Sequence, residues 1–190
     1  MEDKNPCVDF AKLMHQLAAW KRAEYFYLIT LEAETIWQRR SVLLYEHGLI
    51  KGELEQYDEV LAYFKQSLEV KETQGAQGIT EFASTYNNMA TLYYKQKKMD
   101  LAIEYFQKAI EAYNVKPNSN QELVATLYGN IASVLNDQGK HEETLKSNEK
   151  CLNIRINVFP EIYPSLASTY SNISNTFHSM RCHAQALEYA

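Results

Sequence analysis

Apolar residues in the middle of the chain recur mostly at intervals of four or eight positions. Between residues 86 and 113 they include Met89, Tyr93, Leu101, Tyr105, Ala109 and Ile110. Intervals of this size place side chains on one face of an α-helix, whereas a strand would alternate at every second residue. Polar residues at 97–100 interrupt the pattern, and Gly139 in the next such break suits a left-handed helix C-cap. The pattern predicts pairs of amphipathic helices joined by short turns.

The same pattern repeats along the chain with a period of 42 residues. A tyrosine marks each period and an asparagine follows it two positions later: Tyr86 with Asn88, Tyr128 with Asn130, and Tyr170 with Asn172. Small residues recur in the same frame, at Gly48, Ala90, Ala132 and Ser174. Small side chains let two paired helices approach closely, and large ones such as Phe106 then fill the remaining space. A fixed period of this length is typical of repeat proteins built from one supersecondary unit.

The order of small, aromatic and alanine positions within each period resembles that of the tetratricopeptide repeat. The unit that begins at residue 83 carries this order at Ala90, Tyr93, Ala102, Phe106 and Ala109. The usual period of that family is about 34 residues. The longer period seen here, with the runs Tyr-Asn-Asn-Met-Ala and Tyr-Ser-Asn-Ile-Ser, is similar to the kinesin light chain and nephrocystin-like subclass. Four residues depart from the family pattern, and we expect looser packing around them: His47, Lys51, Asn148 and Cys151.

The resemblance implies an all-α fold, an α-α superhelix (solenoid) of stacked antiparallel helix pairs. In this frame, residues 1–40 form a divergent N-terminal repeat or a capping helix pair. Residues 41–82, 83–124 and 125–166 form whole repeats, and 167–190 form an incomplete repeat. Because this last repeat is unfinished, we expect the chain to be a segment of a longer array. Self-association through the incomplete C-terminal repeat is an open alternative.

Composition and charge exclude several other classes of protein. The 190 residues include 19 Lys and Arg against 24 Asp and Glu, which gives a net charge of −5. Without a basic surface, a nucleic-acid partner is not expected. No apolar stretch approaches the roughly 18 residues of a membrane span, and no signal peptide is recognisable, so we expect no membrane partner and a cytoplasmic location. Three widely separated cysteines favour reduced thiols over a disulfide framework.

The sequence contains no recognisable catalytic constellation. It lacks a glycine-rich phosphate loop, the Gly-x-Ser-x-Gly and His-Glu-x-x-His motifs and a Cys-x-x-Cys pair. The nearest approach to a metal site is the group His178, Cys182 and His183, but a predicted turn near Arg181 separates its members. We therefore predict a chain that is not an enzyme, with no catalytic residue, no metal and no cofactor.

The resemblance places the candidate binding site on the concave face, which is formed by the first helix of each pair. The residues expected to line this groove are Asn87, Asn88, Thr91, Tyr94, Lys95, Asn130, Ser133, Asn136, Asp137, Asn172 and Asn175. An asparagine amide offers one acceptor and two donors, which suit the backbone of an extended peptide. Similarity to kinesin light chains implies that the repeated asparagines hold a cargo peptide. The alternative is that they bond a neighbouring backbone carbonyl and tie adjacent repeats together.

These observations predict a non-catalytic scaffold that binds a peptide segment of a partner protein in its concave groove. The alternative is an accessory array, or a fragment, of a larger motor-adaptor, signalling or ADP-ribosyltransferase-type protein. Lys95 is outnumbered along the groove by three carboxylates, Glu46, Glu53 and Asp137. We therefore expect a mildly negative groove that favours a neutral or basic segment. The identity of the partner is not encoded in these residues.

Overall fold

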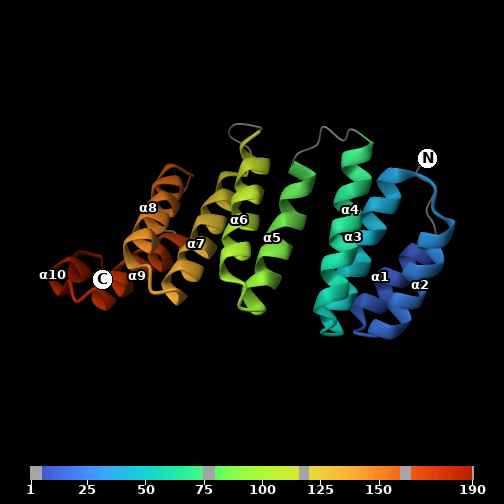
Figure 1. Cartoon of the computed structure of the whole chain (residues 1–190), viewed down its shortest axis with the longest axis horizontal. Coiled ribbons are helices and arrows are strands. Elements are labelled where there is room, and N and C mark those ends of the chain that lie inside the picture. The colour runs from blue at the N-terminus through green and yellow to red at the C-terminus, as the bar shows by residue number, and fades with distance from the viewer. Residues whose placement is uncertain (1–5, 75–79, 116–119, 159–163, 190) are drawn as a thin grey trace. The chain divides into compact units, whose positions relative to one another are not determined.

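The computed structural model describes residues 6–74, 80–115, 120–158 and 164–189, and within these ranges every regular element is an α-helix. Two compact units divide the chain, Met1–Gly78 (unit 1) and Ile79–Ala190 (unit 2). Unit 1 contains α1 (Pro6–Gln16), α2 (Trp20–Ala33), α3 (Trp37–Glu53) and α4 (Tyr57–Thr73). Unit 2 contains α5 (Thr80–Lys95), α6 (Met99–Asn114), α7 (Gln121–Asp137), α8 (His141–Val158), α9 (Pro164–Ser179) and α10 (His183–Glu188). Inside each unit, consecutive helices pack as antiparallel neighbours (Figure 1), which confirms the predicted all-α class.

The turns inside the helix pairs share one backbone conformation. Positive φ angles of 59°, 60°, 73° and 61° occur at Glu55, Lys97, Gly139 and Arg181, at intervals of 42 residues. In unit 1 the turn between α1 and α2 has the same feature at Ala18, 37 residues before Glu55. Glycine adopts this conformation without steric cost. The left-handed cap expected at Gly139 is confirmed by its φ of 73°, and its N–H donates to the carbonyl of Asn136 at 2.9 Å.

The helix pairs begin slightly before the repeat boundaries that the sequence predicts. The first helices α3, α5, α7 and α9 begin at Trp37, Thr80, Gln121 and Pro164. These starts lie three or four residues ahead of positions 41, 83, 125 and 167. The offset varies by only one residue along the chain, so it changes where each repeat is cut and not how its two helices pair. The division into five segments stays a prediction.

Close helix approach depends on the small residues, most clearly at Gly48 in unit 1. A Cβ added there would lie 2.7 Å from Cε1 of Phe64, well inside van der Waals contact. The Phe64 ring from α4 therefore occupies the space that any larger residue on α3 would need. In unit 2, Ser174 takes the corresponding position on α9, and its hydroxyl donates to the carbonyl of Ala186 on α10 at 2.7 Å. Small residues thus bring the paired helices into direct contact.

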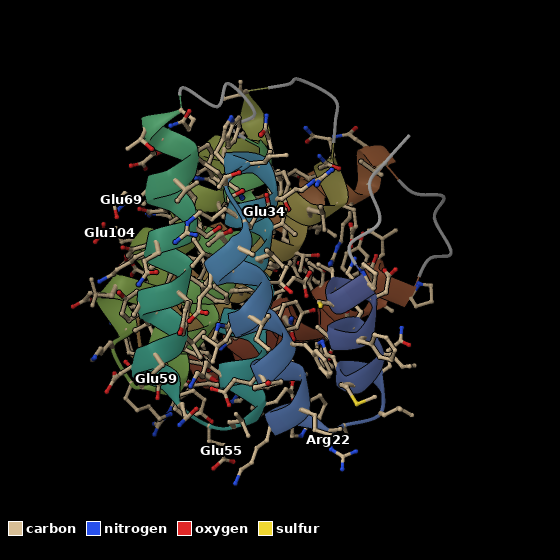
Figure 2. The ribbon with its side chains drawn as sticks, turned by 90° about the vertical axis from the view of Figure 1, so that its right-hand side faces the viewer. Arg22, Glu34, Glu55, Glu59, Glu69 and Glu104 are labelled. Atoms are coloured by element: carbon tan, nitrogen blue, oxygen red, sulfur yellow. The ribbon has the colours of Figure 1, made fainter. Side chains whose placement is uncertain are left out.

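Two of the residues that depart from the family pattern are enclosed in unit 1. Lys51 is 7% exposed, and its ammonium pairs with Glu24 on α2 and with Glu59 on α4. Glu59 is labelled in Figure 2. Burial opposes the charge of Lys51, but the hydrogen bonds to both carboxylates outweigh it and raise the pKa. His47 is fully buried, with Nε2 3.8 Å from the Glu24 carboxylate and its ring beside that of Tyr63. Both positions are thus enclosed by neighbouring helices, and the looser packing expected around them stays a prediction.

Candidate peptide-binding groove

Two of the carboxylates expected along the groove, Glu46 and Glu53, lie on α3 of unit 1. The predicted peptide contacts all lie on the first helices of unit 2, α5, α7 and α9. We call the surface that these contacts form the first-helix face. Helix α5 carries Asn87, Asn88, Thr91, Tyr94 and Lys95; helix α7 carries Asn130, Ser133, Asn136 and Asp137; and helix α9 carries Asn172 and Asn175. None of these side chains is buried. The helical period of 3.6 residues explains this placement, since each helix turns its apolar positions inward and these polar positions outward.

Two of the predicted contacts, Tyr94 and Asp137, are bonded to each other. The Tyr94 hydroxyl on α5 donates to Oδ2 of Asp137 on α7 at 2.7 Å. This hydrogen bond raises the pKa of Tyr94, and partial burial and the charge of Asp137 raise it further. Beside it, Nε2 of Gln138 donates to Oδ1 of Asp100 at 3.0 Å, which links α7 to α6. Tyr94 and Asp137 therefore connect consecutive helix pairs. The sequence did not indicate this structural role.

The three repeated asparagines differ in their surroundings. The amide of Asn88 accepts a hydrogen bond from Nδ2 of Asn87 at 3.4 Å, at the long end of such contacts. Asn130 is partly exposed and Asn172 is exposed, and neither side-chain amide has a hydrogen bond to another residue that the structure describes. At Asn172 it is the backbone carbonyl that accepts, from the Thr176 hydroxyl at 2.7 Å. The amides of Asn130 and Asn172 are thus available to a ligand.

An ionic cluster holds α9 in register with α7. Arg155 on α8 donates to both carboxylate oxygens of Glu122 on α7, at 3.0 and 3.3 Å. The same guanidinium donates to the carbonyl of Ser165 at 3.0 Å and to the hydroxyl of Thr169 at 2.8 Å, both on α9. A planar guanidinium has enough donors to join three helices at once. Arg155 thereby helps to position the asparagines of α9 beside those of α7.

A polar pocket opens between α7, α8 and α9, with a volume of about 170 Å³. Its lining residues are Ala132, Ser133, Asn136, Thr144, Asn148, Asn172, Asn175, Thr176 and Ser179. Four of them are predicted groove residues, so the structure brings Ser133, Asn136, Asn172 and Asn175 together. Asn148, on the second helix α8, was singled out by the sequence only as a departure from the family pattern. The looser packing expected at that position is confirmed, and it takes the form of this pocket.

The described residues show neither a metal cluster nor a membrane-spanning helix. No group of three or more His, Cys, Asp or Glu side chains within the described ranges could hold a metal ion. The rings of His178 and His183 lie 5.0 Å apart across the turn at Arg181, whose φ is positive as in the other turns. Cys182 contacts the carbonyl of Met180 at 3.7 Å instead. Within the same ranges, no helix combines the length and the apolar character that crossing a bilayer requires.

Two family models, both described as tetratricopeptide repeat, match the chain. One matches residues 81–157 and 123–190, and the other matches residues 42–74. Together they cover more than half of the chain. A comparison with curated proteins gives no significant match.

Several solved structures share the fold. BtubC (BKLC) from P. vanneervenii is 17% identical with a TM-score of 0.81, over 95% of this chain and 74% of that one. A candidate kinesin light chain from Podosopora anserina, with nearly identical TPR-like repeats, is 12% identical with a TM-score of 0.77, over 97% and 90% of the two chains. YrrB, described as a TPR protein with an unusual peptide-binding site, is 21% identical with a TM-score of 0.66, over 99% and 83%. At these identities the likeness concerns the fold alone.

Proposed function

The chain belongs to the tetratricopeptide repeat family of protein-interaction scaffolds, and we propose that its first-helix face binds an extended peptide segment of a partner protein. The observation that carries this proposal is the set Asn88, Asn130 and Asn172. These residues occupy the same position on three successive first helices of unit 2. An extended peptide presents a carbonyl or an N–H at regular intervals, and amides repeated along the face can pair with both kinds of group.

The environment of the asparagines supports recognition of a ligand over a purely architectural role. Tying consecutive repeats together is already done by Tyr94 with Asp137 and by Arg155 with its partners on α7 and α9. The amides of Asn130 and Asn172 take no part in those links. A ligand that covers these amides must supply hydrogen-bond partners for them, since each polar group left unpaired in an interface costs about 1–3 kcal/mol of binding free energy. A peptide backbone meets this need without requiring a particular sequence.

The charges on the first-helix face of unit 2 favour a peptide without a strong net charge. Among the proposed contacts, Lys95 and Asp137 carry opposite charges and the others are neutral. Such a face attracts no strongly charged ligand over long range, so shape and hydrogen bonding dominate selection. We expect the chain to act by binding, without catalysis or a cofactor, and to do so in the cytoplasm.

A peptide array probed with three forms of the full chain tests the proposal. The array carries unrelated extended peptides, both neutral and basic. The forms are the wild type, the triple variant Asn88→Ala/Asn130→Ala/Asn172→Ala and a control variant Gln107→Ala/Glu149→Ala. The control residues are exposed on the second helices α6 and α8. We expect the wild type and the control to capture the same peptides. The triple variant should give a signal at least about tenfold lower, which corresponds to a loss of about 1.4 kcal/mol or more in binding free energy. Equal capture by the triple variant, with an unchanged circular dichroism spectrum, would contradict the proposal.

A further inference from the structure

The polar pocket between α7, α8 and α9 exists because an asparagine stands where the preceding repeats have phenylalanine. Asn148 follows Phe106 by 42 residues, and Phe106 follows Phe64 by the same interval. All three side chains are 2% exposed. In the two earlier helix pairs a phenyl ring fills this position in the core. An amide is smaller than a phenyl ring, and the space that it leaves contributes to the 170 Å³ of the pocket.

A second replacement opens the pocket toward the first-helix face. Tyr94 and Asp137 close the corresponding place between α5 and α7 with their 2.7 Å hydrogen bond. One period later, Asn136 and Ser179 occupy the equivalent positions on α7 and α9. Both are exposed, and both line the pocket. Because these two side chains are shorter than the pair they replace, the pocket meets the surface proposed to hold a peptide.

The pocket contains a buried acceptor that lacks a partner. Within the part of the chain that the structure describes, Oδ1 of Asn148 is buried and makes no hydrogen bond. The hydroxyl groups around it already donate to backbone carbonyls one turn earlier in their own helices. These bonds run from Ser133 to the carbonyl of Gly129, from Thr144 to that of Lys140, from Thr176 to that of Asn172 and from Ser179 to that of Asn175. These hydroxyl oxygens can still accept. Among the buried polar atoms of the lining residues that the structure describes, the one without a hydrogen bond is therefore an acceptor, and it calls for a ligand group that donates.

The absence of charge around the pocket narrows the chemistry of that ligand. None of the nine lining residues is ionisable. A lysine or arginine side chain would give up its hydration there without meeting a carboxylate. An acidic side chain, when ionised, has no proton to donate and would leave Oδ1 of Asn148 unpaired. A neutral carboxamide brings two donors and one acceptor, which pair with the oxygen of Asn148 and with the amide N–H groups of Asn172 or Asn175.

The size of the pocket indicates a single side chain. Sites for small molecules usually measure about 300–1,000 Å³, well above the volume found here. We propose that the pocket receives the carboxamide of a glutamine or asparagine side chain from a peptide bound along the first-helix face. This inference rests on the proposed function and specifies one position of the ligand. The peptide backbone lies along the repeated asparagines, and one amide side chain enters between α7 and α9.

Peptide libraries of one length, with a single fixed residue at the centre and random residues elsewhere, test the inference. The fixed residue is glutamine, glutamate, lysine or leucine. We expect the full chain to retain the glutamine library at least about tenfold better than the other three libraries. A site built to hydrogen-bond a polar group discriminates against ligands that lack this group. Asn148→Phe, which restores the residue of the earlier repeats, should abolish this preference while overall capture persists. Should this variant fail to fold, Ser179→Tyr closes the mouth of the pocket from an exposed position outside the predicted peptide contacts and should have the same effect.

The possible results separate this inference from the proposed function. Equal retention of the glutamine and leucine libraries by the wild type would overturn the inference and leave peptide binding intact. So would a glutamine preference that survives both substitutions. If no library is retained, the proposed function and the inference both fail. A final arm adds free N-acetylglutamine amide as a competitor. This compound is compared with a glutamine peptide of the library's length. If both displace the glutamine library at the same concentration, the ligand is a free carboxamide, and the assignment to a peptide is wrong.

Discussion

Tyr94 and Asp137, which stand 43 residues apart, join two consecutive helix pairs through a 2.7 Å hydrogen bond. Both residues also lie on the surface proposed to hold a peptide. Their mutual bond occupies one carboxylate oxygen of Asp137, which is then less available to a ligand. It also ties the end of α5 to the end of α7. A peptide that engages Asp137 must therefore compete with an internal bond, whereas one that engages Asn130 does not.

Removing this bond is expected to weaken unit 2 only slightly. Tyr94→Phe deletes the donor, and the carboxylate that it leaves is exposed to water, so we expect a loss of about 0.5–1 kcal/mol in the free energy of unfolding. Asp137→Ala should bring the pKa of Tyr94 back toward 10, because it removes the acceptor of the hydrogen bond that is the largest cause of the rise. NMR titration of ring-labelled tyrosine, assigned with Tyr94→Phe, measures this. An unchanged pKa in Asp137→Ala would show that the bond does not form in solution.

Gly48 should tolerate no larger side chain. Gly48→Ala places a Cβ 2.7 Å from the Phe64 ring, so the ring or the helix must move. We expect a loss of about 1–3 kcal/mol in the free energy of unfolding, measured by urea denaturation. Gly52→Ala on the same helix is the matched control, because its Cβ would meet Val60 at an ordinary 3.9 Å. It should be neutral or stabilising by up to about 1 kcal/mol. Similar effects from both substitutions would contradict the close helix contact.

Arg155 is expected to contribute far more to stability than an exposed ion pair does. Arg155→Ala removes the bonds that join α8 to Glu122 and Thr169, and it leaves a partly buried carboxylate unpaired. A loss of about 2–4 kcal/mol is expected. The control is Lys108→Ala, which breaks the exposed pair with Glu104 on α6 and should cost no more than about 0.5 kcal/mol. Amide hydrogen exchange should locate the effect of Arg155→Ala in α9. A loss no larger than that of the control would count against the cluster.

His47 should make unit 1 sensitive to mild acid. Burial lowers the pKa of His47 below its ordinary 6.5, although the carboxylate of Glu24 opposes the shift. Below pH 6.5 the unfolded chain binds a proton that the folded chain resists, so the free energy of unfolding falls as the pH decreases. The added slope is at most about 1.4 kcal/mol per pH unit, the value for one proton. His47→Leu removes it. Identical slopes for wild type and variant between pH 7 and 5.5 would contradict this assignment.

The helix pairs and the surface of the candidate site follow from the period of the sequence. Apolar positions such as Met89 and Tyr93 repeat at helical spacing, and the polar positions between them face outward in any helix of this register. The left-handed turn at Gly139 was predictable because glycine is favoured there. Lys97 and Arg181 adopt the same conformation without being glycine, and only the 42-residue period could have indicated it.

What the sequence did not indicate depends on partners from other helices. The period shows that Lys51 replaces an aromatic residue, but it does not identify Glu24, on another helix pair, as the residue that balances its charge. Likewise, it does not show that Tyr94 reaches Asp137. The Phe-to-Asn change at position 148 is visible in the sequence, yet a core can respond by collapsing or by leaving a space. Only the packing of α7, α8 and α9 shows that a pocket results.

Site-specific photo-crosslinking shows where on the chain a bound peptide lies. A benzophenone amino acid replaces Ser133 on the first-helix face, or Glu149 on α8, in two versions of the full chain; both native residues are exposed. Each is irradiated with a peptide selected from the array. We predict a crosslink from position 133 that excess unlabelled peptide abolishes, and none from position 149. Crosslinking from position 149 alone would place the ligand on the second helices and contradict binding along the first-helix face.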